Sequence, residues 1–67
     1  MDNWICVYTT NQIYKAEAVK DLLTEENIEA VVMNKKDSWY LFGDVELYVQ
    51  PEDEHLAVEL IKGFKFE

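Results

Sequence analysis

The chain has 67 residues, 49% of them apolar, and a formal net charge of −8 that arises from 14 acidic residues against six lysines. This length holds one small domain, which we place at residues 1–67, and the apolar content is too high for a disordered chain. The chain has no apolar run near the ~18 residues of a membrane helix, no secretory signal pattern and a single cysteine, Cys6. We therefore expect a protein of the reducing cytoplasm, with no membrane as partner.

The charge also argues against nucleic acid as a partner, because a phosphate backbone is bound by basic surface. The sequence has no arginine, the residue that binds phosphate or guanine through two parallel hydrogen bonds. We expect neither nucleic acid nor an anionic lipid surface to bind this chain.

The first half of the chain predicts a strand followed by a helix. Residues 4–9 are rich in β-branched and aromatic side chains, which is typical of a strand. Residues 12–26 change to a helical period, with Thr10 or Asn11 as the expected N-terminal cap and Asn27 as a left-handed residue at the end. The apolar stripe of this helix comprises Ala16, Val19 and Leu23, flanked by Ile13 and Leu22.

The second half predicts two strands, over 28–34 and 44–50, and then a second helix that begins at Pro51 and ends at Gly63. The last residues, 64–67, alternate between apolar and polar side chains, which is compatible with a short fourth strand. The order β-α-β-β-α is that of an α+β protein, and we expect a ferredoxin-like two-layer sandwich.

Alternation along the strands separates two sheet faces. One face is aliphatic and should lie under the helices; its members are Ile5, Val7, Ile28, Ala30, Val32, Val45, Leu47 and Val49. The other, which we call the open face, is mixed, and its large apolar side chains form a candidate surface for a protein partner or a second copy of the chain. The alternative is that the segment from Trp39 to Phe42 folds back and covers it. The candidate partner-binding residues are Trp4, Tyr8, Val31, Met33 and Tyr48.

A second candidate site lies between the second and third strands. Lys35 and Lys36 form an adjacent basic pair in an acidic chain, close to Trp39 and Tyr40. Cations beside aromatic rings could hold a small anionic molecule. The alternative is a solvated turn whose lysines keep a strand edge soluble.

Other chemistry has weaker support in the sequence. Helical spacing brings Glu52, His55 and Glu59 to one face, but such groups are usually exposed surface, and we expect no metal and no cofactor. Cys6 has no evident base beside it, so we expect a partly buried structural thiol rather than a nucleophile. Since no nucleophile, base and orienting group can be assembled, we expect a protein without catalysis.

Several segments resemble one family of small bacterial domains. They are Trp4 to Tyr8, Glu17-Ala18, Leu22-Leu23, the strand opening at Ile28, Gly43, the strand Glu46-Leu47-Tyr48-Val49 and the acidic helix start Pro51-Glu52-Asp53. The family is that of putative prokaryotic signal-transducing proteins, whose members commonly have glycine where this chain has Asn27. It is linked to the PII nitrogen regulators through their ferredoxin-like half, and it supplies no established binding residues. The resemblance implies a regulatory interaction module or, as the alternative, a PII-like sensor of a small anionic metabolite.

Overall fold

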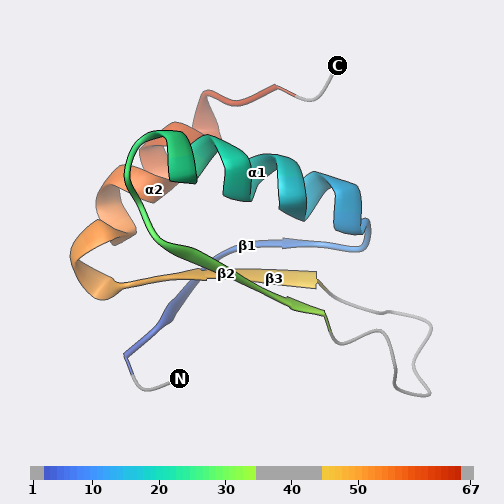
Figure 1. Ribbon diagram of the computed structural model, residues 1–67, viewed down its shortest axis with the longest axis horizontal. Helices are drawn as coiled ribbons and strands as arrows, with labels where there is room; N and C mark the ends of the chain where they lie inside the picture. The colour runs from blue at the N-terminus through green and yellow to red at the C-terminus, as the bar shows by residue number, and fades with distance from the viewer. Residues whose placement is uncertain (1–2, 35–44, 66–67) are drawn as a thin grey trace.

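The computed structural model describes residues 3–34 and 45–65, which form one layer of strands and one layer of helices (Figure 1). The helices and strands follow the predicted order β-α-β-β-α, with a short 3₁₀ turn before the second helix. In chain order they are β1 (Ile5–Thr10), α1 (Ile13–Glu25), β2 (Ala30–Asn34), β3 (Val45–Val49), the 3₁₀ turn η1 (Pro51–Asp53) and α2 (Glu54–Lys62).

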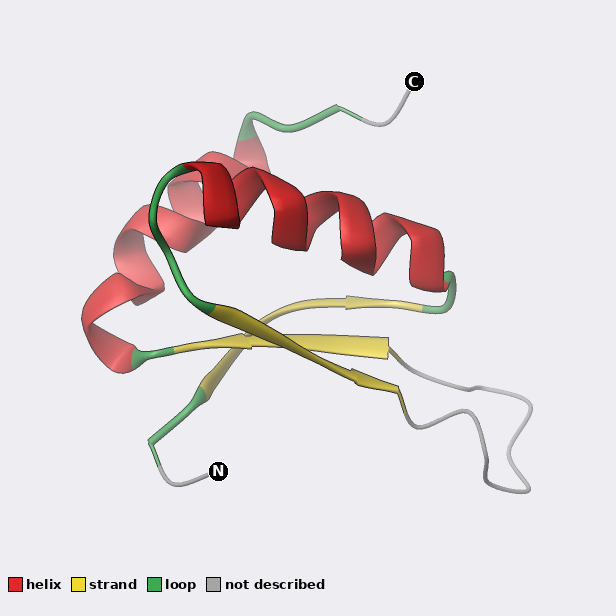
Figure 2. Cartoon of the chain, in the orientation of Figure 1, coloured by secondary structure: helices red, strands yellow, loops and turns green. Residues whose placement is uncertain are grey.

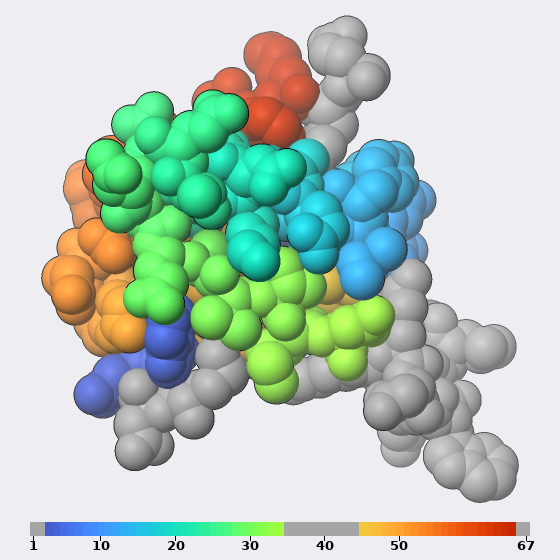
Figure 3. Space-filling view, viewed as in Figure 1, coloured from blue at the N-terminus to red at the C-terminus, as the bar shows by residue number. Residues whose placement is uncertain are grey.

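The three described strands form one sheet in the order β1-β3-β2, with β3 antiparallel to both neighbours. Both helices lie on the same face of this sheet (Figure 2). Helix α1 contacts all three strands and α2 contacts β1; the side chains of α1 lie directly over those of β2 in Figure 3. This arrangement is α+β and compatible with a ferredoxin-like sandwich, as the sequence predicts.

The core lies between the sheet and the helices, where the sequence places it. The central strand β3 provides three fully buried side chains, and the apolar stripe of α1 packs onto them. Helix α2 contributes Ala57, with Leu60, Ile61 and Phe64 packed at the margin of the core. Among residues 3–34 and 45–65, the fully buried ones are Ala16, Val19, Leu23, Val45, Leu47, Val49 and Ala57.

The end of α1 follows the prediction closely. Asn27 has a φ of 64°, the left-handed conformation that asparagine tolerates better than most residues. Its amide donates to the carbonyl of Thr24 at 3.0 Å, and the amide of Ile28 donates to the carbonyl of Leu23 at 2.9 Å. This pair of bonds is a Schellman motif, and the apolar contact that accompanies it joins Ile28 to Leu23 in the core.

The predicted cap at the start of α1 is wrong in its position. The capping residue is Gln12, whose side chain makes no capping hydrogen bond. Thr10 instead accepts a hydrogen bond from the Gln12 amide at 3.2 Å, through its Oγ1. The threonine therefore stabilises the turn before the helix rather than the first helical amides.

The chain after α2 does not form a strand as far as it is described. Gly63 ends the helix at a φ of −89°, which any residue adopts, and Phe64 then packs against the core. Neither Phe64 nor Lys65 belongs to a strand, and residues 66–67 lie outside the described part of the chain. Within residues 3–34 and 45–65, the outer edge of β1 therefore has no strand beside it.

Candidate functional site

The open face is built from two rows of side chains that cross all three strands. The strand register aligns Cys6 of β1, Tyr48 of β3 and Val31 of β2 in one row. Directly opposed residues of antiparallel strands point to the same face. The second row comprises Thr9, Glu46 and Met33.

A β-bulge in β1 corrects the predicted position of Tyr8. The register shifts between Cys6 and Tyr8, so that Val7 is the extra residue and Tyr8 lies opposite the buried Leu47. A bulge reverses the faces of all residues after it. Tyr8 therefore turns to the helix side and packs against the core, while Thr9 takes its place on the open face.

Four of the five candidate partner-binding residues remain on the open face. Val31 and Tyr48 are half-buried, and Met33 is 37% exposed. Trp4 is also half-buried. The next residue, Ile5, pairs with Val49 of the core and so faces the helices. Alternation along the chain then places Trp4 on the open face. Both helices lie on the other side of the sheet (Figure 2). The side chains of Val31, Met33 and Tyr48 therefore give the open face an apolar surface beside polar groups.

The polar centre of the open face is a hydrogen-bonded pair on β3. The hydroxyl of Tyr48 donates to Oε1 of Glu46 at 2.6 Å. This bond, with a smaller contribution from desolvation and from the charge of Glu46, raises the pKa of Tyr48 from 10.0 to about 12. The bond holds the Glu46 carboxylate in a defined position at the middle of the sheet.

Cys6 is exposed, which corrects the expected partly buried thiol. Its Sγ lies 3.6 Å from the backbone oxygen of Tyr8 and 3.6 Å from Oγ1 of Thr9. Both contacts are weak hydrogen bonds of a thiol, and they place Cys6 and Thr9 together on the open face. The bulge brings these two side chains to one side, because strict alternation would separate residues three apart.

The second candidate site cannot be compared with the structure. Lys35, Lys36, Trp39 and Tyr40 all lie outside the described residues, as does the segment from Trp39 to Phe42. The anion-binding hypothesis, and the alternative that this segment covers the open face, both stay predictions from the sequence.

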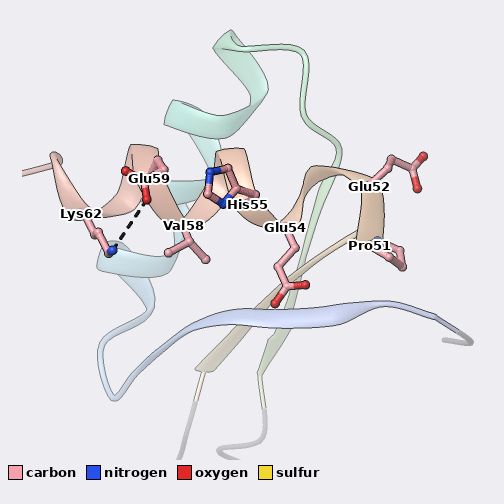
Figure 4. Close-up of a pocket in the computed structure, with 7 residues that line it drawn as sticks. All are labelled: Pro51, Glu52, Glu54, His55, Val58, Glu59 and Lys62. Carbon is pink, nitrogen blue, oxygen red and sulfur yellow. Dashed lines mark ion pairs between the residues drawn. The ribbon is translucent and has the colours of Figure 1, made fainter.

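A surface hollow of about 480 Å³ lies along α2 and the turn before it. Its lining includes the candidate metal ligands Glu52, His55 and Glu59. Figure 4 shows the carboxylates of Glu52 and Glu54 pointing in different directions, and Glu59 pairs with Lys62 at 3.7 Å. Within the described part of the chain, no three histidine, cysteine or acidic side chains converge on one point that could hold a metal ion.

The two described helices can be compared with the requirements for a helix that crosses a membrane. Neither of them, within residues 3–34 and 45–65, has the length and apolar character that a membrane-crossing helix needs. The polar and acidic residues of α2 along the hollow are consistent with an exposed helix surface.

Comparison with known protein families gives one match that covers most of the chain. A family model described as putative prokaryotic signal transducing protein matches residues 4–65, from just before β1 to just beyond α2. The chain belongs to this family. The family predicted from the sequence is thus confirmed, and the match spans every described helix and strand. No curated protein and no solved structure matches the chain.

Proposed function

We propose that the protein is a cytoplasmic regulatory module without catalysis, which binds a protein through the open face of its sheet. The observation that supports this proposal most directly is the position of Trp4, Val31, Met33 and Tyr48 on the face that neither helix covers. Apolar side chains grouped on one surface are typical of protein-binding sites. The family description, putative prokaryotic signal transducing protein, supports the same role.

The size of the domain gives a second physical argument. A chain of 67 residues has a small core, and burying additional apolar surface against a partner would increase its stability. Here Met33 is 37% exposed on the open face, whereas the opposing face of β3 is fully buried. Burial of Met33 and its apolar neighbours against a partner would therefore add stability on the open face.

Photocrosslinking in the cells that produce the protein tests this proposal. A photoreactive amino acid replaces Val31 or Met33 on the open face and, as the control, Tyr14 on α1, which is 63% exposed. We expect adducts of discrete mass from the two open-face positions and none of the same mass from position 14. The proposal fails if the open-face positions give no adduct, or the same adducts as position 14.

The sequence favours one alternative function, a sensor of a small anionic metabolite. The adjacent lysines 35 and 36 stand in a chain of net charge −8, so they are the natural place for an anion to bind. A thermal-shift screen with nucleotides and organic acids tests this alternative. Stabilisation that is lost in the double variant Lys35→Gln/Lys36→Gln would support it, and an unchanged melting temperature across the screen would refute it.

A further inference from the structure

The outer edge of β1 has the chemistry of a strand edge that accepts a further strand. Within the described part of the chain, no strand lies beside β1 on the side away from β3. Edge strands of natural proteins usually carry lysine, proline or other charged residues, which prevent pairing with another chain. Residues 3–14, which include all of β1, contain no charged residue and no proline, although 30% of the whole chain is charged. In the sequence, β2 is instead flanked by Glu29 and by Lys35 and Lys36.

Helix α2 lies over β1 and provides a surface for the side chains of an added strand. The two elements are in contact, and Figure 4 shows Glu54 and Val58 pointing from α2 toward β1. Val58 is half-buried, and the hollow of about 480 Å³ follows the same side of α2 from Pro51 to Lys62. Every second side chain of a strand points to the same face. A strand beside β1 would therefore direct alternate side chains toward Val58 and the hollow.

The position of α2 makes a second copy of the chain a poor occupant of this edge. Pairing of β1 with β1 of another copy would place the two strands about 4.8 Å apart. Each α2 lies over its own β1, so the two α2 helices would be brought together with their strands. Packed helices need about 8–10 Å between their axes. An extended segment without a helix on this side avoids that overlap.

The charge of the chain indicates which segment is attracted. The net charge of −8 counts every residue of the sequence, and it favours the approach of a positively charged segment. The residues that line the hollow include three glutamates and one lysine, Lys62, whose Nζ lies 3.7 Å from Oε2 of Glu59. A lysine or arginine on the segment is therefore favoured near the start of α2, where Glu52 and Glu54 lie.

We propose that the outer edge of β1 binds an extended segment of another protein, in which apolar and polar residues alternate and a lysine or arginine is present. Amides and carbonyls of β1 that point away from β3 would pair with the segment, which adds a strand to the sheet beneath α2. The β-bulge bends and twists β1, so a short segment fits this edge better than a long flat strand. This contact does not depend on the open face.

Synthetic peptides provide the probe for this proposal. The test peptide alternates valine and threonine and carries a lysine at each end. One control has the same sequence with every valine and threonine N-methylated, which removes the amide donors, and a second control has glutamate in place of both lysines. Amide chemical shifts of the ¹⁵N-labelled full chain give each affinity. We expect the test peptide to bind at least about tenfold more tightly than either control.

Amide hydrogen exchange shows whether the peptide pairs with β1. In the free chain, the amides of β1 that point away from β3 should exchange rapidly, and the test peptide should slow their exchange at least about tenfold. Slow exchange of every β1 amide in the free chain would show that this edge is already covered and would overturn the proposal. Equal affinity for the N-methylated peptide would overturn it as well.

Matched variants of α2 locate the contact on the side of the hollow. Val58→Asp should weaken the test peptide about tenfold, whereas Leu56→Asp, at a position of the same helix that is 48% exposed, should weaken it less than about threefold. If Val58→Asp is unfolded, the isosteric Val58→Thr gives the comparison, at an expected loss of about threefold. Equal weakening by the variants at 56 and 58 would contradict a strand beneath α2.

Sedimentation velocity of the chain alone tests the choice between a separate segment and a second copy. We expect the sedimentation coefficient to be the same for the unmodified chain and for Val58→Asp over a range of concentrations. A dimer that Val58→Asp disrupts would overturn the proposal that a different protein occupies this edge. Because none of these variants changes the open face, the photocrosslinks from positions 31 and 33 test the proposed function separately.

Discussion

Replacing Leu47 with alanine tests which face of the sheet carries the core. Leu47 is fully buried on the central strand, aligned with Tyr8 of β1 and Val32 of β2. Alanine removes the isopropyl group and leaves a cavity, and such changes in a tightly packed core cost about 3–4 kcal/mol. A domain of 67 residues has a free energy of unfolding of roughly 3–10 kcal/mol. We therefore expect Leu47→Ala to remove roughly 30% of the stability or more.

Urea unfolding followed by circular dichroism measures this loss. With a slope of about 1 kcal/mol per molar urea for a small domain, the unfolding midpoint should fall by about 3 M. The control is Met33→Ala on the open face, which is 37% exposed and should cost no more than about 1 kcal/mol. If Leu47→Ala is unfolded in the absence of urea, Leu47→Val gives the measurement, at an expected cost of about 1 kcal/mol. Equal losses from Leu47→Ala and Met33→Ala would refute this account of the core.

Three further predictions concern individual residues. Asn27→Ala should lower the free energy of unfolding by about 1 kcal/mol, because the φ of 64° at this position is left-handed and unfavourable for alanine. Asn27→Gly should change the free energy of unfolding by less than about 0.5 kcal/mol, because glycine adopts this conformation readily. Urea unfolding measures both variants. The absorbance of Tyr48 should titrate at about pH 12, and Glu46→Gln should lower that pKa, because the Glu46 carboxylate is the main cause of the increase from 10.0. Since the raised pKa belongs to the folded state, the contribution of Tyr48 to stability is complete below pH 10 and is lost as the pH rises through 12. Tyr8→Ala should cost about 1–2 kcal/mol because this side chain packs against the core, whereas Cys6→Ala should cost less than about 0.5 kcal/mol because the thiol is exposed.

Each of these predictions has a result that would contradict it. Equal stability of the Asn27→Ala and Asn27→Gly variants would show that backbone conformation is unimportant at this position. Titration of every tyrosine near pH 10 would exclude the bond from Tyr48 to Glu46. A larger loss from Cys6→Ala than from Tyr8→Ala would place the bulge elsewhere in β1.

The layered fold follows from features that the sequence shows directly. The apolar side chains of α1 and of β3 each recur with a regular period. Such a period shows which side chains share a face of the helix or the strand. Asn27 is an equally local signal, since its conformation depends on one residue and on the end of one helix. Family membership also follows from the sequence, because the matched segment spans residues 4–65.

The cap of α1 shows where local signals become ambiguous. Thr10 and Asn11 both precede the helix, and both can cap one. The turn that leads from β1 into α1 instead uses the Thr10 hydroxyl to accept from Gln12. The geometry of that turn depends on how β1 and α1 pack together, which the residue types alone do not state.

The sequence by itself determined that one aliphatic sheet face lies beneath two helices. It also determined that the chain belongs to the family described as putative prokaryotic signal transducing proteins. Only the tertiary structure decided the composition of the open face. Val7 and Tyr8 are both apolar, so the sequence fits a regular strand and a bulged strand equally well, and pairing with β3 selects the bulge. That one extra residue turns Tyr8 to the helix side, where it packs against the core, and brings Thr9 beside Cys6. The reason is that a shift of one position exchanges the two faces for every residue that follows.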